Sequence, residues 1–103
     1  MPTGIMGVGG NKGAIAVSLH MAETSIVVVN SHLAASQSKV AKRNANVNTI
    51  IKNLLFEEAG LNLMEHKYIF WCGDLNYRID SDSFETVAEM IGKNQIIELR
   101  KLD

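Results

Sequence analysis

The stretch FWCGDLNYRI at residues 70–79 determines how the rest of this chain is interpreted. The preceding run 67–72 is apolar and aromatic, which is typical of a buried strand, and Gly73 then allows the backbone to turn away. Asp74 and Asn76 follow at the carboxyl end of that strand and lie on the same side while the chain stays extended. Asp74 can take a proton from water, whereas Asn76 can donate N–H to an oxygen that gains negative charge. The pattern therefore indicates a candidate catalytic pair.

The same residues allow two other interpretations. Gly-Asp at a strand end is common turn chemistry, because Asp and Asn side chains bond to their own backbone, and from these two residues alone the turn is favoured. A calcium loop would place oxygen ligands at Asp74, Asn76, Asp80, Asp82 and Glu85. The calcium loop fails because Arg78 occupies a ligand position, Ile79 replaces the required Gly, and a strand precedes the loop where a helix belongs.

Composition sets the limits of this interpretation. The chain has 103 residues and is 47% hydrophobic, which suits one globular domain or a part of a larger one. A formal net charge of −1 excludes a generally basic nucleic-acid binder, so no nucleic-acid partner is expected. Cys72 is the only cysteine, which excludes an intrachain disulfide. Without an apolar run that could span a bilayer, and without a signal-type leader, we expect a cytoplasmic location, with the cytoplasmic face of membranes as an option.

The remaining pattern predicts an α/β chain over residues 1–103 with no internal boundary. Residues 3–8 are typical of a strand, and residues 10–13 of a hairpin turn that exposes Lys12. A nucleotide-binding loop does not fit there, because Lys12 precedes Gly13 and a strand-like sequence rather than Ser or Thr and a helix. Alternation predicts a half-buried strand over 14–20, with Ile15, Val17 and Leu19 on one side. Residues 26–30 predict a central strand that ends close to His32.

Three helices are expected in the rest of the chain. An apolar stripe predicts a helix over 38–59 that Gly60 ends and that packs on the sheet. A second helix is expected from Asp82, as its N-cap, to Gly92, and residues 95–102 are helical in pattern. The second helix is predicted to bury Phe84, Val87, Ala88 and Ile91.

Three segments in a fixed order carry a resemblance to a known family. They are GNKGA at 10–14, NSHLAA at 30–35 and WCGDLNYR at 71–78. In this order they resemble the type II inositol polyphosphate 5-phosphatases of the exonuclease-endonuclease-phosphatase superfamily, over nearly the whole chain. The resemblance implies an α/β sandwich of two packed sheets, of the deoxyribonuclease-I-like type. It also implies hydrolysis, with Mg²⁺, of the 5-position phosphate of phosphoinositides, such as phosphatidylinositol 4,5-bisphosphate, or of inositol polyphosphates.

The resemblance assigns roles to individual residues. It makes Asp74 the base that activates the attacking water, Asn76 a residue that orients this water, and His32 a hydrogen-bond partner of the scissile phosphate. From its position alone, His32 is better interpreted as a histidine bonded to a backbone carbonyl. The substrate-binding candidates that the resemblance suggests are Lys12, Arg43 and Asn44.

The family also has segments that this chain does not contain. Its Mg²⁺ ligands are an upstream Asn and Glu, so no metal ligand is expected within this chain, and the family's downstream Pro-x-Trp-Cys-Asp-Arg and Ser-Asp-His segments are absent too. We therefore expect the central part of a catalytic domain, inactive alone, with uncovered apolar sheet faces. Its expected partners are a phosphoinositide headgroup or soluble inositol polyphosphate, the missing parts of the domain, and a membrane surface contacted peripherally. The alternatives are a nuclease of the same superfamily and a non-catalytic product that binds phosphoinositide or a protein.

Overall fold

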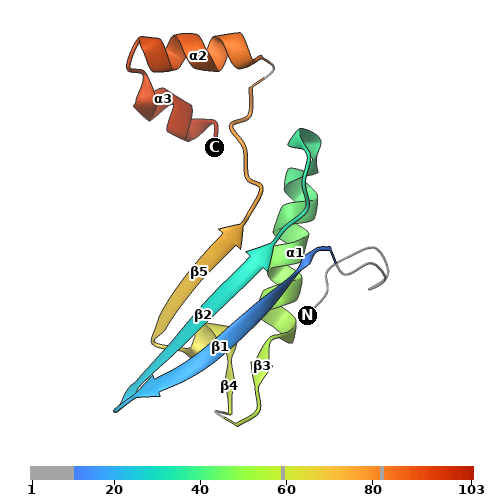
Figure 1. Cartoon of the computed structure of the whole chain (residues 1–103), viewed down its shortest axis with the longest axis vertical. Coiled ribbons are helices and arrows are strands. Elements are labelled where there is room, and N and C mark those ends of the chain that lie inside the picture. Colours follow the sequence, from blue (N-terminus) through green and yellow to red (C-terminus); the bar gives the residue numbers. More distant parts are fainter. Residues whose placement is uncertain (1–10, 59, 82) are drawn as a thin grey trace.

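The computed structural model describes residues 11–58, 60–81 and 83–103, in which one three-stranded sheet forms the centre. Strand β1 spans Gly13–Met21, β2 spans Thr24–His32 and β5 spans Tyr68–Asp74, in the sheet order β1-β2-β5. β1 pairs antiparallel with β2, and β2 pairs parallel with β5. The parallel pair requires a long connection, which helix α1, Val40–Asn53, provides behind the sheet in Figure 1. The predicted central strand and the α/β class are confirmed.

The β1–β2 hairpin is tighter than the sequence predicted. Met21 pairs with Thr24, so only Ala22 and Glu23 connect the strands, and Ala22 takes a positive φ of 50°. Both predicted strands, 14–20 and 26–30, are therefore longer in the structure, because the first ends at Met21 and the second begins at Thr24. The strand predicted at 3–8 and the first residue of the turn at 10–13 lie outside the described residues.

The covered face of the sheet carries the core. Several side chains have no exposed surface and belong to one apolar cluster. Among them are Val27 and Val29 of β2, Leu33, which follows β2, and Ile50 of α1. β1 presents its small residues to this cluster, with Ala14 buried and Ala16 packed against it. The predicted half-buried strand is confirmed, but its covered side is that of the small residues: Ile15, which is 70% exposed, and its neighbours Val17 and Leu19 point to the other face. Small side chains toward the helix allow α1 to approach the sheet closely.

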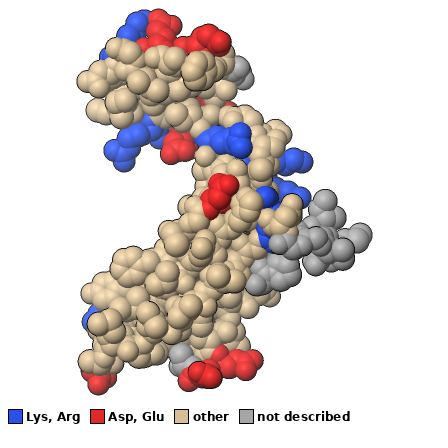
Figure 2. Space-filling model, viewed as in Figure 1, with Lys and Arg blue, Asp and Glu red and all other residues tan. Residues whose placement is uncertain are grey.

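The opposite face of the sheet is apolar and uncovered by the described residues. Phe70, expected to be buried, is 59% exposed, and Cys72 is also exposed. Register places the outward side chains in rows across the strands, such as Val17, Val28 and Phe70. Figure 2 shows this face as a broad surface with few charges over the strands. An apolar surface of this kind is typical of one that another layer covers.

Helix α1 is shorter than predicted. A short 3-10 turn, Gln37–Lys39, precedes it, and at Leu54 the backbone becomes extended instead of continuing the helix to residue 59. β3, Leu55–Phe56, and β4, Leu61–Asn62, form a hairpin in which Gly60 has a φ of 64°. Gly60 is therefore a turn residue and not the end of the helix. The extended chain lets Phe56 pack edge-on against the ring of His66, with 5.0 Å between the two ring centres. His66 directly follows the 3-10 turn Leu63–Glu65.

Helices α2, Phe84–Gly92, and α3, Ile96–Lys101, form a hairpin beyond the carboxyl end of β5 (Figure 1). Helix α2 ends at Gly92, as predicted. Its N-cap is Ser83, whose side chain accepts from the Thr86 N–H. The predicted N-cap, Asp82, lies outside the described residues. The predicted burial is wrong, because α2 contains no buried residue and Phe84 is 80% exposed. The chain is accordingly elongated, with extents of 50 × 36 × 16 Å.

Candidate active site

The candidate site lies where two parallel strands end together. His32 is the last residue of β2, Asp74 is the last residue of β5, and the two are register partners. The Leu33 N–H donates to the Asp74 carbonyl at 3.0 Å, which extends the pairing one step past the strands. The carboxyl ends of parallel strands are where α/β proteins bind ligands. Sheet register thus brings together residues that are 42 positions apart in the sequence.

Gly73 is required at this edge. A Cβ built on Gly73 would lie 2.1 Å from the Ser31 carbonyl oxygen, and its φ is 118°. Both observations exclude a larger residue without movement of β2 or β5. The glycine therefore lets β5 run close beside β2 up to Asp74.

Lys12, His32 and Asp74 form a contiguous polar group. The Lys12 Nζ lies 2.8 Å from the His32 Nε2, and the same ring nitrogen is 3.5 Å from the Asp74 Oδ2. Since the ammonium group has only donors, Nε2 accepts from Lys12 and the ring proton is on Nδ1 in this arrangement. Lys12 reaches His32 because Gly13, its neighbour, pairs with His32 in the sheet. The side chains of His32 and Asp74 are about half exposed, at 47% and 64%, so a ligand can approach them.

Asn76 lies beside Asp74 because the chain turns there, whereas the sequence predicted an extended chain. The chain does not stay extended, because Asn76 has a φ of 57° and its N–H donates to the Asp74 Oδ1 at 3.1 Å. This is the turn chemistry that the sequence also allowed. The Asn76 Nδ2 donates one hydrogen to the Leu33 carbonyl at 3.1 Å, and its second hydrogen is available to a ligand. Turn formation and a site role are therefore compatible.

Arg43 and Asn44 of α1 contact the loops that follow the strands. Arg43 has no exposed surface, and its Nη1 donates to the carbonyls of Ala34 and Ser36 at 3.2 and 2.7 Å. Its guanidinium carbon lies 5.3 Å from the centre of the Tyr77 ring, and the Tyr77 hydroxyl donates to the Asn44 Oδ1 at 2.5 Å. The substrate contacts predicted for Arg43 and Asn44 stay predictions. Sequence reasoning did not single out Tyr77, although a tyrosine that directly follows the Asp-Leu-Asn segment is a usable signal.

The space next to these residues is an open depression of about 630 Å³, lined by Gly73, Leu75, Asn76, Tyr77 and Asp103. Among the described residues, no group of three or more His, Cys, Asp or Glu side chains is placed to hold a metal ion. The His, Cys, Asp and Glu side chains of the described residues therefore do not form a metal site by themselves.

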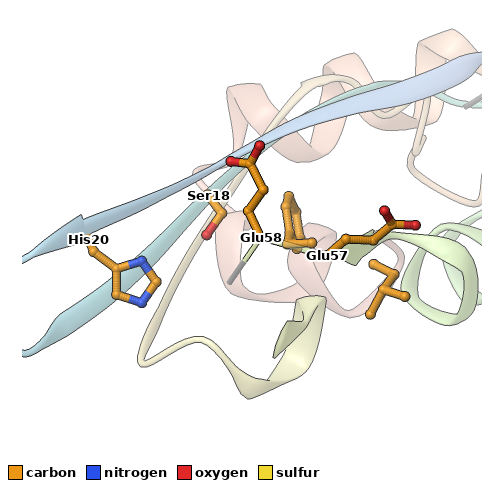
Figure 3. A pocket seen from close by; sticks show the side chains of 6 residues that line it. Ser18, His20, Glu57 and Glu58 are labelled. Atoms are coloured by element: carbon orange, nitrogen blue, oxygen red, sulfur yellow. The ribbon is translucent and has the colours of Figure 1, made fainter. Parts of the chain in front are cut away.

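A second pocket, of about 740 Å³, lies at the other end of the strands (Figure 3). Ser18 and His20 of β1 line it together with Glu57 and Glu58 of the β3–β4 connection. The Ser18 Oγ is 2.8 Å from the Nε2 of buried His66, whose Nδ1 lies 3.1 Å from two backbone carbonyl oxygens, those of Asn62 and Leu63. The carbonyls place the ring proton on Nδ1, so Nε2 accepts from Ser18. This pair links β1 to the 3-10 turn and belongs to the structure rather than to the candidate site.

Comparison with known proteins places this arrangement in context. The family described as endonuclease/exonuclease/phosphatase family 2 matches residues 1–103. Synaptojanin-2 of Rattus norvegicus is 40% identical over 101 residues, which cover 98% of this chain and 7% of that protein. Type IV inositol polyphosphate 5-phosphatase 3 of Arabidopsis thaliana is 39% identical over 107 residues, covering 97% of this chain and 16% of that protein. The resemblance to inositol polyphosphate 5-phosphatases is confirmed.

A solved structure matches the fold as well. It is the inositol polyphosphate 5-phosphatase domain of SPsynaptojanin in complex with inositol (1,4)-bisphosphate and a calcium ion. The TM-score is 0.81 and the identity 35%, over 91% of this chain and 27% of that chain. The chain thus spans only a small part of the proteins that it matches.

Proposed function

Because the chain belongs to endonuclease/exonuclease/phosphatase family 2, we propose that it is part of a phosphatase acting on the 5-position phosphate of an inositol lipid or inositol polyphosphate. The observation that carries the proposal is the placement of His32, Asp74 and Asn76 at one sheet edge. Relatives named as inositol polyphosphate 5-phosphatases support the substrate class, with phosphatidylinositol 4,5-bisphosphate as the lipid to test first. The formal net charge of −1 counts against a nuclease, which binds a polyanion.

In the proposed reaction, a water oxygen attacks the phosphorus atom and the bond to the inositol oxygen breaks. Asp74 takes the proton that the water loses, and the leaving oxygen is released as an alcohol once it gains a proton. The free N–H of Asn76 stabilises negative charge on a phosphoryl oxygen, and His32 bonds another oxygen of the same phosphate. Lys12, beside His32, supplies a positive charge for the substrate's phosphate groups.

The proposed cofactor is Mg²⁺, with ligands from parts of the domain outside this chain. The solved relative contains a calcium ion together with its inositol bisphosphate, which supports a divalent cation near the substrate. In such reactions Mg²⁺ polarises a phosphoryl oxygen and neutralises developing charge. A readout that does not depend on turnover is the Mg²⁺ dependence of inositol bisphosphate binding.

We further propose that the uncovered apolar sheet face packs against the remaining parts of the same domain. Ile15, Val17 and Phe70 are large, exposed and close together on this face. The chain covers 27% of the solved domain, so most of the relative's mass is available to cover such a surface. The same exposed face favours a second candidate function, in which the chain is a non-catalytic product that binds a protein partner or phosphoinositide.

The proposed location is the cytoplasm, with peripheral contact to membranes through the lipid substrate. The support is chemical: the single cysteine, Cys72, is a free thiol, which suits a reducing compartment. No helix among the described residues is long and apolar enough to cross a membrane. Fractionation of cells that express the tagged chain tests this location.

The function is tested by phosphate release from a short-chain 4,5-bisphosphorylated inositol lipid with Mg²⁺. Two proteins are compared: the chain itself, and a chimera in which it replaces the matching segment of the solved SPsynaptojanin domain. In the chimera we expect activity that Asp74→Asn lowers by about 10²- to 10⁴-fold, because the variant keeps the shape but loses the proton acceptor. The matched control is Asp80→Asn, which changes an exposed carboxylate and should leave activity within about twofold.

Three outcomes decide between the candidates. Activity of the chimera that depends on Asp74, with none from the chain alone, supports a catalytic segment that needs the rest of its domain. A chimera that folds and is inactive contradicts the phosphatase assignment and favours the binding function. Equal activity of the Asp74→Asn and parent chimeras would show that another residue is the base.

A further inference from the structure

We propose that Arg43 is a positioning residue, which holds together the two loops that follow the strand ends with His32 and Asp74. These are the β2 loop, residues 33–36, which follows His32, and the β5 loop, residues 75–77, which follows Asp74. The inference rests on the proposed function for its effect on activity. Its effect on the loops themselves is independent of the reaction.

The contacts of Arg43 reach both loops from one buried position. Nη1 donates to the carbonyl oxygens of Ala34 and Ser36 in the β2 loop, and the guanidinium plane faces the Tyr77 ring in the β5 loop. The Tyr77 hydroxyl is bonded in turn to Asn44, the residue after Arg43 on α1. Two adjacent residues of α1 therefore contact both loops, in addition to the hydrogen bonds that join Leu33 to Asp74 and to Asn76.

The β2 loop contains backbone that is unfavourable by itself. Ser36 has a φ of 94°, a value that is unfavourable for a residue with a Cβ, whereas asparagine tolerates the φ of 57° at Asn76 in turns. Such strain persists only where surrounding contacts impose it, and it is concentrated at functional sites. The Ser36 carbonyl is a direct acceptor of Arg43, so this contact is placed at the strained residue, and the Tyr77 ring that Arg43 contacts directly follows the turn residue Asn76.

The charge of Arg43 is difficult to explain as a contribution to stability. Its side chain is fully buried, its Nε and Nη2 have no hydrogen-bond partner, and the part of the chain that the structure describes gives it no ion pair. A buried cation without a carboxylate partner costs free energy of folding. The guanidinium group is planar, so it can donate to carbonyls at its edge and stack on an aromatic ring with its face. This geometry suits the contacts with the two loops. A lysine has the charge without this geometry.

The test uses the chimera described above and a matched pair of substitutions, Arg43→Met and Lys42→Met. Lys42 is the exposed neighbour on α1, and no ion pair or hydrogen bond of its side chain is present among the described residues. We expect Arg43→Met to lower kcat by about 10- to 100-fold, because a misplaced catalytic group loses its alignment. We expect KM to change by less than about twofold, since Arg43 has no exposed surface with which to contact a substrate. Lys42→Met should leave both constants within about twofold.

Two kinetic results would overturn the inference. A large rise in KM with an unchanged kcat would make Arg43 a substrate contact, as its place near the family's cleft suggested. An unchanged kcat in a folded Arg43→Met protein would remove any role in alignment. Arg43→Lys is the second variant, for use if Arg43→Met does not fold, and we expect it to lose kcat as well because it cannot stack on Tyr77 and bond two carbonyls together.

A second measurement separates positioning from a general loss of structure and does not require the proposed reaction. Amide hydrogen exchange is compared in the full chain with and without Arg43→Met. We expect exchange at Leu33 and Asn76, whose N–H groups donate to Asp74, to rise by about tenfold or more, while Val27 and Val29 in the sheet stay protected. A uniform rise at all four amides would show a merely structural role and would contradict the inference. If the parent chimera shows no Asp74-dependent activity, the proposed function fails while this measurement still decides the role of Arg43.

Tyr77→Leu completes the test as a double-mutant cycle. If Arg43 acts through the Tyr77 ring, Tyr77→Leu alone reproduces part of the loss in kcat, and adding Arg43→Met to it costs less than in the parent. Fully additive losses would show that the two residues act separately, which contradicts a shared contact between the loops.

Discussion

The sheet with α1 and the α2–α3 hairpin differ in how far their apolar side chains are buried. Val27, Val29 and Ile50 have no exposed surface, whereas α2 has no buried residue. Both regions have regular backbone hydrogen bonding and clear sequence signals, so secondary structure does not explain the difference. The sheet packs on α1 as a second layer, whereas in the hairpin only Leu99 of α3 is buried among the described residues (Figure 1).

This difference explains where a precise site can be built. His32 and Asp74 end two strands of the sheet, and Asn76 follows Asp74. One face of this sheet packs on α1. Packed elements hold side chains in fixed positions, which catalysis requires. In the hairpin, only Leu99 has such support among the described residues. Paired substitutions test the comparison, with one member of each pair in the sheet region and one in the hairpin.

The largest expected difference is between Gly73→Ala and Gly92→Ala. At Gly73 the new methyl group would lie 2.1 Å from the Ser31 carbonyl oxygen, at a φ of 118°, whereas nothing lies within 4 Å of a Cβ at Gly92. We expect Gly73→Ala to cost more than about 4 kcal/mol of unfolding free energy. Gly92→Ala should stabilise α2 by about 0.4–1 kcal/mol, because alanine loses less conformational entropy.

Urea unfolding of the full chain measures both effects. Fluorescence of Trp71, the only tryptophan, reports on β5, where its Nε1–H donates to the Ser31 Oγ. Circular dichroism reports on the helices. A Gly73→Ala chain as stable as the parent would contradict the close approach of β5 to β2 and, with it, the geometry of the site.

A smaller difference is expected between two isoleucines. Ile50 is fully buried on α1, and Ile91 of α2 is 55% exposed. We expect Ile50→Ala to cost about 3–4 kcal/mol, the usual range for a large-to-small change in a core. Ile91→Ala should cost less than about 1 kcal/mol in the chain alone. A large cost at Ile91 within the chimera, but not in the chain, would show that the rest of the domain covers the hairpin.

The candidate site was predictable because it depends on strand ends. A β-branched run that ends at His32 and an aromatic run that ends before Asp74 are both visible in the sequence, and parallel pairing places their ends together. The contacts of Arg43 were not predictable in this way. They depend on which side of α1 faces the strand-end loops, and the helix pattern alone does not place Tyr77 against it.

The limits of the sequence are clearest in α1 and β1. Leu54 and Leu55 continue the helical spacing, but the chain extends there because Phe56 packs on His66, a contact made ten positions later. Alternation in β1 identified two faces correctly. It did not show that the face with Ala14 and Ala16, rather than the face with Ile15 and Val17, packs on the helix. Hydrophobicity alone favours the larger residues, whereas the close approach of α1 requires the smaller ones.

The smallest effect that tests the comparison is at the N-terminus of α2. The Ser83 Oγ accepts from the Thr86 N–H at 3.1 Å, so Ser83→Ala should cost about 1 kcal/mol, seen as a lower helical signal in the hairpin. Ser83→Asp keeps an acceptor at the cap and should restore the parent value. Trp71 fluorescence should not change in either variant, because the hairpin and the sheet share few contacts. A fluorescence transition that shifts together with the helical signal would show that the two regions unfold as one unit, and would contradict the division between them.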